Sequence, residues 1–258
     1  CQALGGAKNH ALILPDADID YTTDQLISAA YGSSGQRCMA LSVAVVFSDI
    51  KDEFIQDLER KVQKLKFGLD DLHSNSFGPL VSKEHLESVK NYIDMSEGEG
   101  ARVLVDGRDF LKRKNSNNGY FLGPTIIDNV RSNMKSYQNE IFGPVLQIME
   151  VNKLSDAIKL INNNRFGNGC CIFTRNGEQA RTFSENVEIG MVGVNIPLPV
   201  PTSFHSFGGW KNSLFGDLNI YGPDGVRFYT QRKTITQRWP SSGSSKGVDL
   251  SMPNNLKQ

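Results

Sequence analysis

The chain has 258 residues, of which 39% are hydrophobic and 22% charged, a balance typical of globular proteins. Its 28 Lys and Arg residues equal its 28 Asp and Glu residues, so no net charge points to nucleic acid or an anionic membrane as a partner. No apolar run approaches the ~20 residues that a membrane-spanning helix needs. The four cysteines form no C-x-x-C pair and no zinc-like spacing, which favours a reducing compartment and predicts no metal site.

The first part of the chain alternates between strand-like and helix-like patterns. His10–Leu14 is a short apolar run that predicts a buried strand. Asp18 is a candidate N-cap for a helix that runs to about Tyr31. Val43–Phe47 is rich in β-branched residues and predicts a second strand. The helix expected after it has one apolar face, made of Phe54, Leu58, Val62 and Leu65.

The same alternation continues through the middle of the chain. A further helix starts near Ser82, and strands and helices follow in turn over 103–105, 145–149, 155–164, 170–174, 178–187 and 190–196. Strands that alternate with helices of ten or more residues predict an α/β fold with a parallel sheet. Because side chains alternate along a strand, Cys170 and Cys171 are expected on opposite faces of that sheet.

The C-terminal part differs in pattern from the rest. Val226–Trp239 alternates in the manner of an exposed strand, around Ile235 and its neighbouring threonines. Residues 240–258 include the serine-rich run Ser241–Ser245, and this composition predicts a disordered tail.

One loop, Gly32–Ala40, contains the best candidate for chemistry. It carries Cys38 at a glycine-loosened junction between a predicted helix and a predicted strand, where a reactive group can be held at the floor of a cleft. Arg37 beside it has two candidate roles, to favour the thiolate or to grip a substrate carboxylate through a bidentate pair. The alternative is a buried structural cysteine beside a solvated arginine.

Three motifs in order carry a family resemblance. They are Ala3-Leu-Gly-Gly-Ala-Lys-Asn-His10, then Gly35-Gln-Arg-Cys38, and about a hundred residues later Asn139-Glu-Ile-Phe-Gly-Pro-Val145. Together they resemble the E-L-G-G-K-N, G-Q-x-C and E-I-F-G-P-V signatures of the aldehyde dehydrogenase superfamily. The first two motifs, with Phe228-Tyr-Thr-Gln231, resemble its methylmalonate-semialdehyde dehydrogenase branch in particular.

The resemblance implies an α/β, parallel-sheet aldehyde dehydrogenase catalytic domain with a C-terminal oligomerisation strand. Residues 1–205 would be the catalytic (cysteine) domain, 206–239 a return segment with the oligomerisation strand, and 240–258 a disordered tail. Subunits of the family are roughly twice this long, so the chain is expected to be a piece of a larger enzyme that lacks most of the cofactor domain. In agreement, no G-x-G-x-x-G or G-x-x-x-x-G-K-[ST] motif occurs in it.

The resemblance also assigns roles to single residues. Cys38 would be the nucleophile that forms a thioester with the oxidised aldehyde. Glu140 would bind the nicotinamide ribose of NAD, and Phe142 would lie beside the nicotinamide. For Arg37 the two candidate roles stay open, and binding of the substrate carboxylate is taken as the prediction.

Ala3 stands where hydrolytic members of the family carry a glutamate that activates water. Without that base, coenzyme A is expected as the acyl acceptor, as in the acylating branch of the family. The implied reaction converts methylmalonate or malonate semialdehyde, with NAD and coenzyme A, to propionyl-CoA or acetyl-CoA. The implied assembly is a homo-oligomer, a tetramer when full length, in the mitochondrial matrix, or in the cytoplasm if the source is bacterial. A different class of function stays open, in which the chain is a truncated, non-catalytic structural or interaction subunit.

Overall fold

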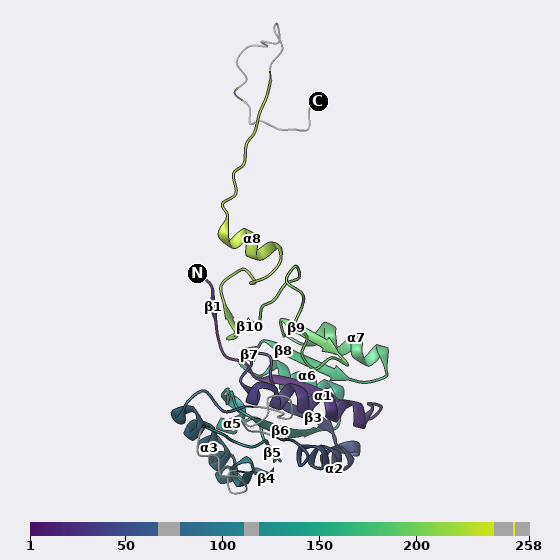
Figure 1. Cartoon of the computed structure of the whole chain (residues 1–258). Helices are drawn as coiled ribbons and strands as arrows, with labels where there is room; N and C mark the ends of the chain where they lie inside the picture. The colour runs from purple at the N-terminus through teal and green to yellow at the C-terminus, as the bar shows by residue number, and fades with distance from the viewer. Residues whose placement is uncertain (67–77, 111–118, 240–249, 251–258) are drawn as a thin grey trace.

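The protein is built around one seven-stranded sheet, as seen in the computed structural model, which describes residues 1–66, 78–110, 119–239 and 250 (Figure 1). All neighbouring strands are parallel except β4 and β5, which pair antiparallel at one edge. The strand order is β4 (Arg102–Val105), β5 (Thr125–Asp128), β6 (Val145–Val151), β3 (Leu41–Phe47), β2 (Asn9–Ile13), β8 (Gly169–Phe173) and β9 (Met191–Val194). The predicted α/β fold with a mainly parallel sheet is confirmed.

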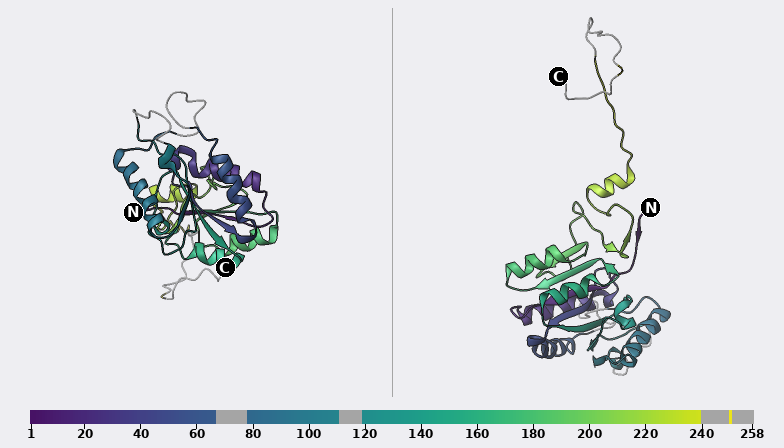
Figure 2. Two further views of the ribbon diagram at one scale, coloured as in Figure 1. Left: turned by 90° about the horizontal axis from the view of Figure 1, so that it is seen from below. Right: turned by 180° about the vertical axis from the view of Figure 1, so that it is seen from behind.

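Helices cover both faces of this sheet (Figure 2). One face packs against α1 (Ile19–Tyr31) and α2 (Lys51–Val62). The other packs against α3 (Lys83–Gly98), α6 (Leu154–Asn162) and α7 (Gly177–Asn186). A mainly parallel sheet needs this double cover, because the loops that return the chain to the start of the next strand carry helices onto its faces.

Alternating side chains divide the core into these two layers. Cys170 packs in the layer under α3, α6 and α7, whereas Cys171 packs in the layer under α1 and α2. The expectation that these neighbours lie on opposite faces is confirmed. Each fully buried large apolar side chain of the two layers stabilises the fold by about 1.5–3 kcal/mol relative to an exposed one.

Side-chain caps fix where the helices begin. Asp18 accepts a hydrogen bond from the Tyr21 backbone N–H at 3.1 Å, which confirms the predicted cap of α1. Ser82 caps α3 in the same way, with its hydroxyl accepting from the His85 N–H at 3.1 Å. Such caps satisfy N–H groups that have no partner inside the helix.

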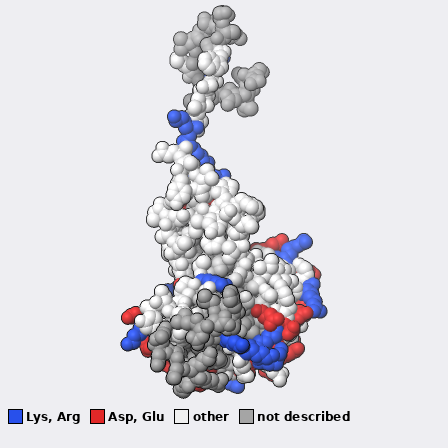
Figure 3. Space-filling model, viewed as in Figure 1, with Lys and Arg blue, Asp and Glu red and all other residues white. Residues whose placement is uncertain are grey.

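A smaller part of the chain projects from the sheet, next to the N-terminal residue (Figure 1). Its short strands are β1 (Ala3–Leu4) with β11 (Leu214–Phe215), and β7 (Phe166–Gly167) with β10 (Trp210–Lys211), and its helix is α8 (Pro223–Tyr229). The face seen in Figure 3 is almost free of charged side chains here. Exposed apolar residues of this part include Leu4, Trp210, Phe215, Val226 and Tyr229.

The structure corrects the start of the strand predicted over Val226–Trp239, because residues up to Tyr229 belong to α8, which has Pro223 in its first turn. Residues 230–239 are exposed and pair with no strand of the described chain. An oligomerisation strand would find its backbone partners on another subunit, so that expectation stays a prediction. The predicted tail at 240–258 lies outside the described residues except for Leu250, and the division at residue 205 stays a prediction.

Two minor helices and two 3-10 turns complete the description, namely α4 (Gly107–Phe110), α5 (Lys135–Gln138), η1 (Gly32–Gly35) and η2 (Ser48–Ile50). In the described ranges, no helix has the length and apolar character that would let it cross a bilayer.

Candidate active site

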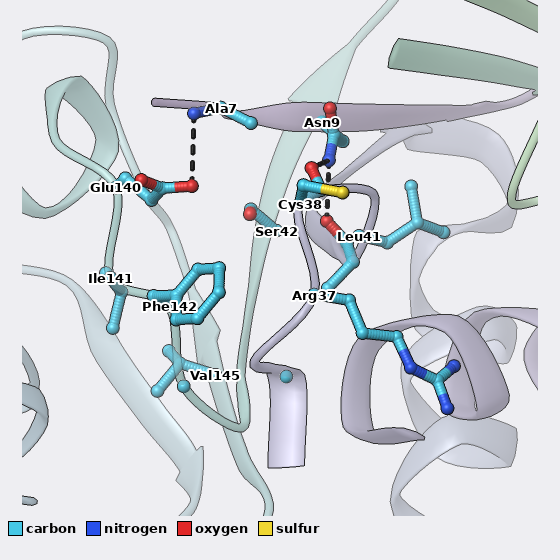
Figure 4. Close-up of a pocket in the computed structure, with 13 residues that line it drawn as sticks. Ala7, Asn9, Arg37, Cys38, Leu41, Ser42, Glu140, Ile141, Phe142 and Val145 are labelled. Carbon is cyan, nitrogen blue, oxygen red and sulfur yellow. Dashed lines mark hydrogen bonds between the residues drawn. The ribbon is translucent and has the colours of Figure 1, made fainter. Parts of the chain in front are cut away.

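The candidate site forms at the amino ends of adjacent parallel strands. Cys38 lies just before β3, Glu140 and Phe142 just before β6, and Ala7 just before β2. Because β6, β3 and β2 are neighbours in the sheet, their amino ends meet at one edge and bring segments a hundred residues apart into one pocket. Figure 4 shows Cys38 on one side of this pocket, with Glu140 and Phe142 on the other.

The loop of Cys38 reaches this edge through a close backbone contact. Gly35 has φ +68°, a left-handed conformation that favours glycine. A Cβ placed on Gly35 would lie 2.1 Å from the carbonyl oxygen of Gly143, so no side chain fits there. The Gly32–Ala40 loop and the segment before β6 therefore come into direct backbone contact at this point.

Cys38 is an exposed free cysteine, whereas Cys170 and Cys171 are buried. Burial raises the pKa of both the Cys170 and the Cys171 thiols, which keeps them protonated near neutral pH. Cys38 is therefore the accessible thiol of the sheet-bearing part of the chain. Cys1, the other exposed cysteine, does not line the pocket.

Glu140 is held by the segment that precedes β2. Its Oε1 accepts a hydrogen bond from the Ala7 N–H at 3.1 Å, and burial is the main cause that raises its pKa. Lys8 is fully buried beneath it and donates to the carbonyls of Ser136 and Asn139 at 2.7 and 3.0 Å. Burial lowers the pKa of Lys8 to about 7, an effect that the nearby Glu140 carboxylate opposes.

Phe142 occupies an unusual backbone conformation, with φ +57°. Bulky residues seldom adopt this region, so something must hold it there. His85 of α3 contacts the Phe142 carbonyl oxygen through Nε2 at 2.7 Å, and the two rings meet edge to face with centroids 6.3 Å apart. The Phe142 side chain remains 38% exposed and is available to a ligand.

Arg37 lines the pocket, but its guanidinium points away from the Cys38 thiol (Figure 4). Its Nε donates to the Ser33 hydroxyl at 2.9 Å, and the guanidinium lies against Gly32. This geometry gives no contact through which Arg37 could favour the Cys38 thiolate. Its role in binding a substrate carboxylate stays a prediction.

Ala3 lies on β1, exposed and outside the pocket lining. Among the described residues that line the pocket, Glu140 carries the only carboxylate. The sequence reasoning therefore located Cys38, Glu140 and Phe142 in one site.

The sequence reasoning missed the polar residues that hold these groups in place. Asn9 and Asn168 both donate to the Cys38 carbonyl oxygen, at 3.0 and 2.9 Å, and Lys8 and His85 hold the opposite loop. Asn9 and Lys8 gave a signal in the sequence, because polar residues directly before an apolar run His10–Leu14 must find partners when the strand is buried. Asn168 and His85 gave none.

Comparison with known proteins places this geometry in a family. The model of the aldehyde dehydrogenase family matches residues 1–235, and the chain belongs to that family. It is 52% identical to a malonate-semialdehyde dehydrogenase of Pseudomonas aeruginosa over 98% of this chain and 51% of that protein.

Solved structures agree with that assignment. A crystal structure of methylmalonate-semialdehyde dehydrogenase from Oceanimonas doudoroffii has a TM-score of 0.90 and 58% identity, over 94% of this chain and 50% of that one. A Mycobacterium tuberculosis aldehyde dehydrogenase complexed with NAD+ has a TM-score of 0.83 and 30% identity, over 90% and 47% of the two chains. The chain thus spans about half the length of the relatives that it matches.

The residues present fit one end of a nicotinamide cofactor. Glu140 uses Oε1 to bind Ala7, and no hydrogen bond from the described residues occupies its Oε2, which can accept from ribose hydroxyls. A Cβ on Gly6 would lie 3.1 Å from that Oε2 and 2.9 Å from the Phe166 ring, so Gly6 keeps the approach to the carboxylate open. No cluster of His, Cys, Asp and Glu suited to a metal ion occurs in the described segments.

Proposed function

We propose that the polypeptide carrying this chain is an acylating, NAD-dependent dehydrogenase of malonate or methylmalonate semialdehyde. The overall reaction joins the semialdehyde, NAD and coenzyme A to give acetyl-CoA or propionyl-CoA, carbon dioxide and NADH. The names of its relatives and the architecture of the pocket support this assignment.

One observation carries the proposal. An exposed thiol, a half-buried carboxylate and an exposed aromatic face line one pocket, although Cys38 and Glu140 lie far apart in the sequence. A structural role does not require an accessible thiol in a pocket with these neighbours. Covalent catalysis through a cysteine does.

The chain's own residues account for the covalent steps. The Cys38 thiolate adds to the aldehyde carbon, and the resulting thiohemiacetal becomes a thioester when hydride leaves that carbon. The nicotinamide, when bound, supplies the hydride acceptor. The Cys38 thioester then exchanges with the thiol of coenzyme A, which returns Cys38 to its free form.

Coenzyme A is the proposed acceptor because the proposed cofactor contact leaves the pocket without a free general base. Glu140 is the one carboxylate there; its Oε1 accepts from the Ala7 backbone, and its Oε2 is the oxygen proposed to bind the ribose of NAD. General-base assistance is worth about 10²–10⁴-fold in rate, so water without it attacks the thioester far more slowly than a thiol does. The bond between the carboxylate and the neighbouring carbon breaks to release carbon dioxide, and that carbon takes up a proton from solvent, which leaves the acetyl or propionyl group.

The experiment is stopped-flow measurement of NADH with malonate semialdehyde, with and without coenzyme A. Without coenzyme A we expect one burst of NADH per active site followed by a stall, and with it steady turnover. Equal steady-state rates in the two conditions would refute the acylating assignment. In a Glu140→Gln variant, the KM for NAD should rise while the slow hydrolysis stays unchanged. A loss of hydrolysis with an unchanged KM would instead identify Glu140 as the base.

Arg37 is proposed to bind the substrate carboxylate after its side chain rotates away from Ser33. Arg37→Lys keeps the charge but loses the bidentate geometry. It should raise the KM for malonate semialdehyde at least tenfold and leave the KM for propanal, which has no carboxylate, within about twofold. Equal changes for both aldehydes would exclude a carboxylate contact.

The exposed apolar side chains around β1, β11 and α8 support a further proposal, that the whole protein covers this surface in a homo-oligomer. They also leave room for the alternative in which the chain is a non-catalytic interaction subunit. The alternative predicts no NADH burst under any condition, and the stopped-flow experiment decides between them.

A further inference from the structure

The backbone of the nucleophile is held by two side-chain amides from other strands. Asn9 donates to the Cys38 carbonyl at 3.0 Å, and Asn168 donates to the same oxygen at 2.9 Å. Asn9 is the first residue of β2, and Asn168 directly precedes β8. The amides thus reach Cys38 from the amino ends of β2 and β8, whereas Cys38 itself lies just before β3.

Both amides also hold the residues that follow Cys38. Asn9 Nδ2 donates to the Ala40 carbonyl at 2.9 Å, and its Oδ1 accepts from the Gly169 N–H at 3.0 Å. Asn168 Nδ2 contacts the Met39 sulfur at 3.1 Å. The two amides therefore connect the segment 38–40 to the amino ends of β2 and β8.

The two amides are buried, whereas the thiol that would react is exposed. Asn9 and Asn168 are 2% and 8% exposed, whereas Cys38 is exposed. Asn168 does not line the pocket, and the amide of Asn9 forms its hydrogen bonds with backbone atoms. Neither amide is therefore placed to bind substrate, and what they control is the orientation of the Cys38 peptide.

We propose that Asn9 and Asn168 are positioning residues. Their two hydrogen bonds to the Cys38 carbonyl oxygen keep the thiol and the Cys38 N–H aligned with a bound aldehyde. This inference rests on the proposed thioester chemistry. A bound aldehyde reacts at a rate that depends on the geometry of approach, whereas a small free electrophile reaches an exposed thiol from many directions.

Sharing one acceptor makes the two amides interdependent. Removal of one amide leaves the Cys38 carbonyl with the other donor, so at this carbonyl each single loss should cost about one neutral hydrogen bond, roughly 3- to 10-fold in rate. Loss of Asn9 also removes its hydrogen bonds to Ala40 and Gly169. Removal of both leaves a part-buried carbonyl without these donors, which costs more than the two single losses together.

The test uses the full polypeptide that contains this chain, as wild type, Asn9→Ala, Asn168→Leu and the double variant. Asn163→Leu, an exposed asparagine at the end of α6, is the matched control. The rate constant of the NADH burst with malonate semialdehyde and NAD reports thioester formation, and the burst amplitude reports the fraction of folded sites. The rate of Cys38 alkylation by iodoacetamide reports thiol reactivity without an aldehyde.

We expect the burst rate constant to fall about 3- to 10-fold in each single variant and by more than the product of the two in the double variant. Alkylation of Cys38 and the KM for NAD should stay within about twofold of wild type. A loss confined to burst amplitude would mean that the amides only support folding and would overturn the proposal. An equal loss in alkylation would overturn it in favour of thiol activation.

Two further outcomes keep the test decisive. If the double variant does not fold, Asn168→Leu alone decides, because within the described chain the Asn168 amide donates only to the Cys38 carbonyl and the Met39 sulfur. If the wild type gives no burst, the proposed function fails, which is distinct from a wild-type burst that the variants share unchanged.

Discussion

The buried side chain of Lys8, next to the segment that carries Glu140, gives a quantitative prediction. Lys8 is 2% exposed, and its ammonium donates to two backbone carbonyls, with the charge of the Glu140 carboxylate nearby. Burial lowers its pKa in the folded protein to about 7, from 10.5 in an exposed chain. The unfolded chain therefore binds a proton that the folded protein lacks between those two pH values.

This difference fixes the sign of the pH dependence. Stability rises with pH wherever the unfolded state holds more protons, so the Lys8 contribution is constant below pH 7 and grows from about pH 7 toward 10.5. One proton corresponds to a slope of about 1.4 kcal/mol per pH unit. Between pH 6 and pH 9, the free energy of unfolding should gain about 2.5 kcal/mol from Lys8.

A Lys8→Met variant isolates this contribution, because methionine has a similar length and no charge. Urea unfolding of both proteins at pH 6, 7, 8 and 9, followed by circular dichroism, gives the difference in unfolding free energy at each pH. The buried thiols Cys170 and Cys171, whose raised pKa values lower stability at alkaline pH, affect both proteins equally and cancel.

We expect the free energy of unfolding of the wild type to rise relative to that of Lys8→Met as the pH rises, with most of the increase above pH 7. Lys159→Met, a change on the exposed side of α6, should run parallel to the wild type at every pH. If the Lys8→Met curve also runs parallel to the wild type from pH 6 to 9, Lys8 has the same pKa in both states. The burial argument would then be wrong.

Gly35 and the cysteines provide two further predictions. Gly35→Ala should slow the NADH burst more than tenfold, because the new Cβ would meet the Gly143 carbonyl and the φ of +68° costs alanine about 1–2 kcal/mol. Gly98→Ala is the control, since open space surrounds its new Cβ, and it should not slow the burst. Under limiting iodoacetamide at neutral pH, mass spectrometry should find Cys38 alkylated before Cys170 or Cys171, and faster labelling of Cys170 would contradict the assignment of the nucleophile.

Local patterns predicted much of the fold because each one has a single physical cause. The cap at Asp18 and the opposite faces of Cys170 and Cys171 depend only on nearby residues and on the strand period. The region from Val226 misled this reasoning. Its alternation of Thr234, Ile235 and Thr236 favours a strand, yet no described segment pairs with it, and Pro223 starts a helix just before it.

The site was predicted only as far as its motifs reach. Cys38, Glu140 and Phe142 lie in recognisable segments, and the structure brings them into one pocket. The amide of Asn168 reaches Cys38 across 130 positions of sequence, and His85 reaches Phe142 across 57. Such contacts depend on strand order and register, which no local pattern contains.

The position of the site at the amino ends of the strands has a consequence for how it works. Open α/β sheets usually bind ligands beyond the carboxyl ends of their strands, where helix N-termini offer N–H groups. Here the pocket lies at the opposite edge, where the backbone of Gly35 lies against that of Gly143 and the Ala7 N–H donates to the Glu140 carboxylate. These contacts tie the segments before β2, β3 and β6 together, and we expect Cys38 and Glu140 to keep their relative position as one unit. Buried side chains behind this unit, Asn9, Asn168 and Lys8, set its geometry, which leaves the exposed faces of Cys38 and Phe142 free for chemistry.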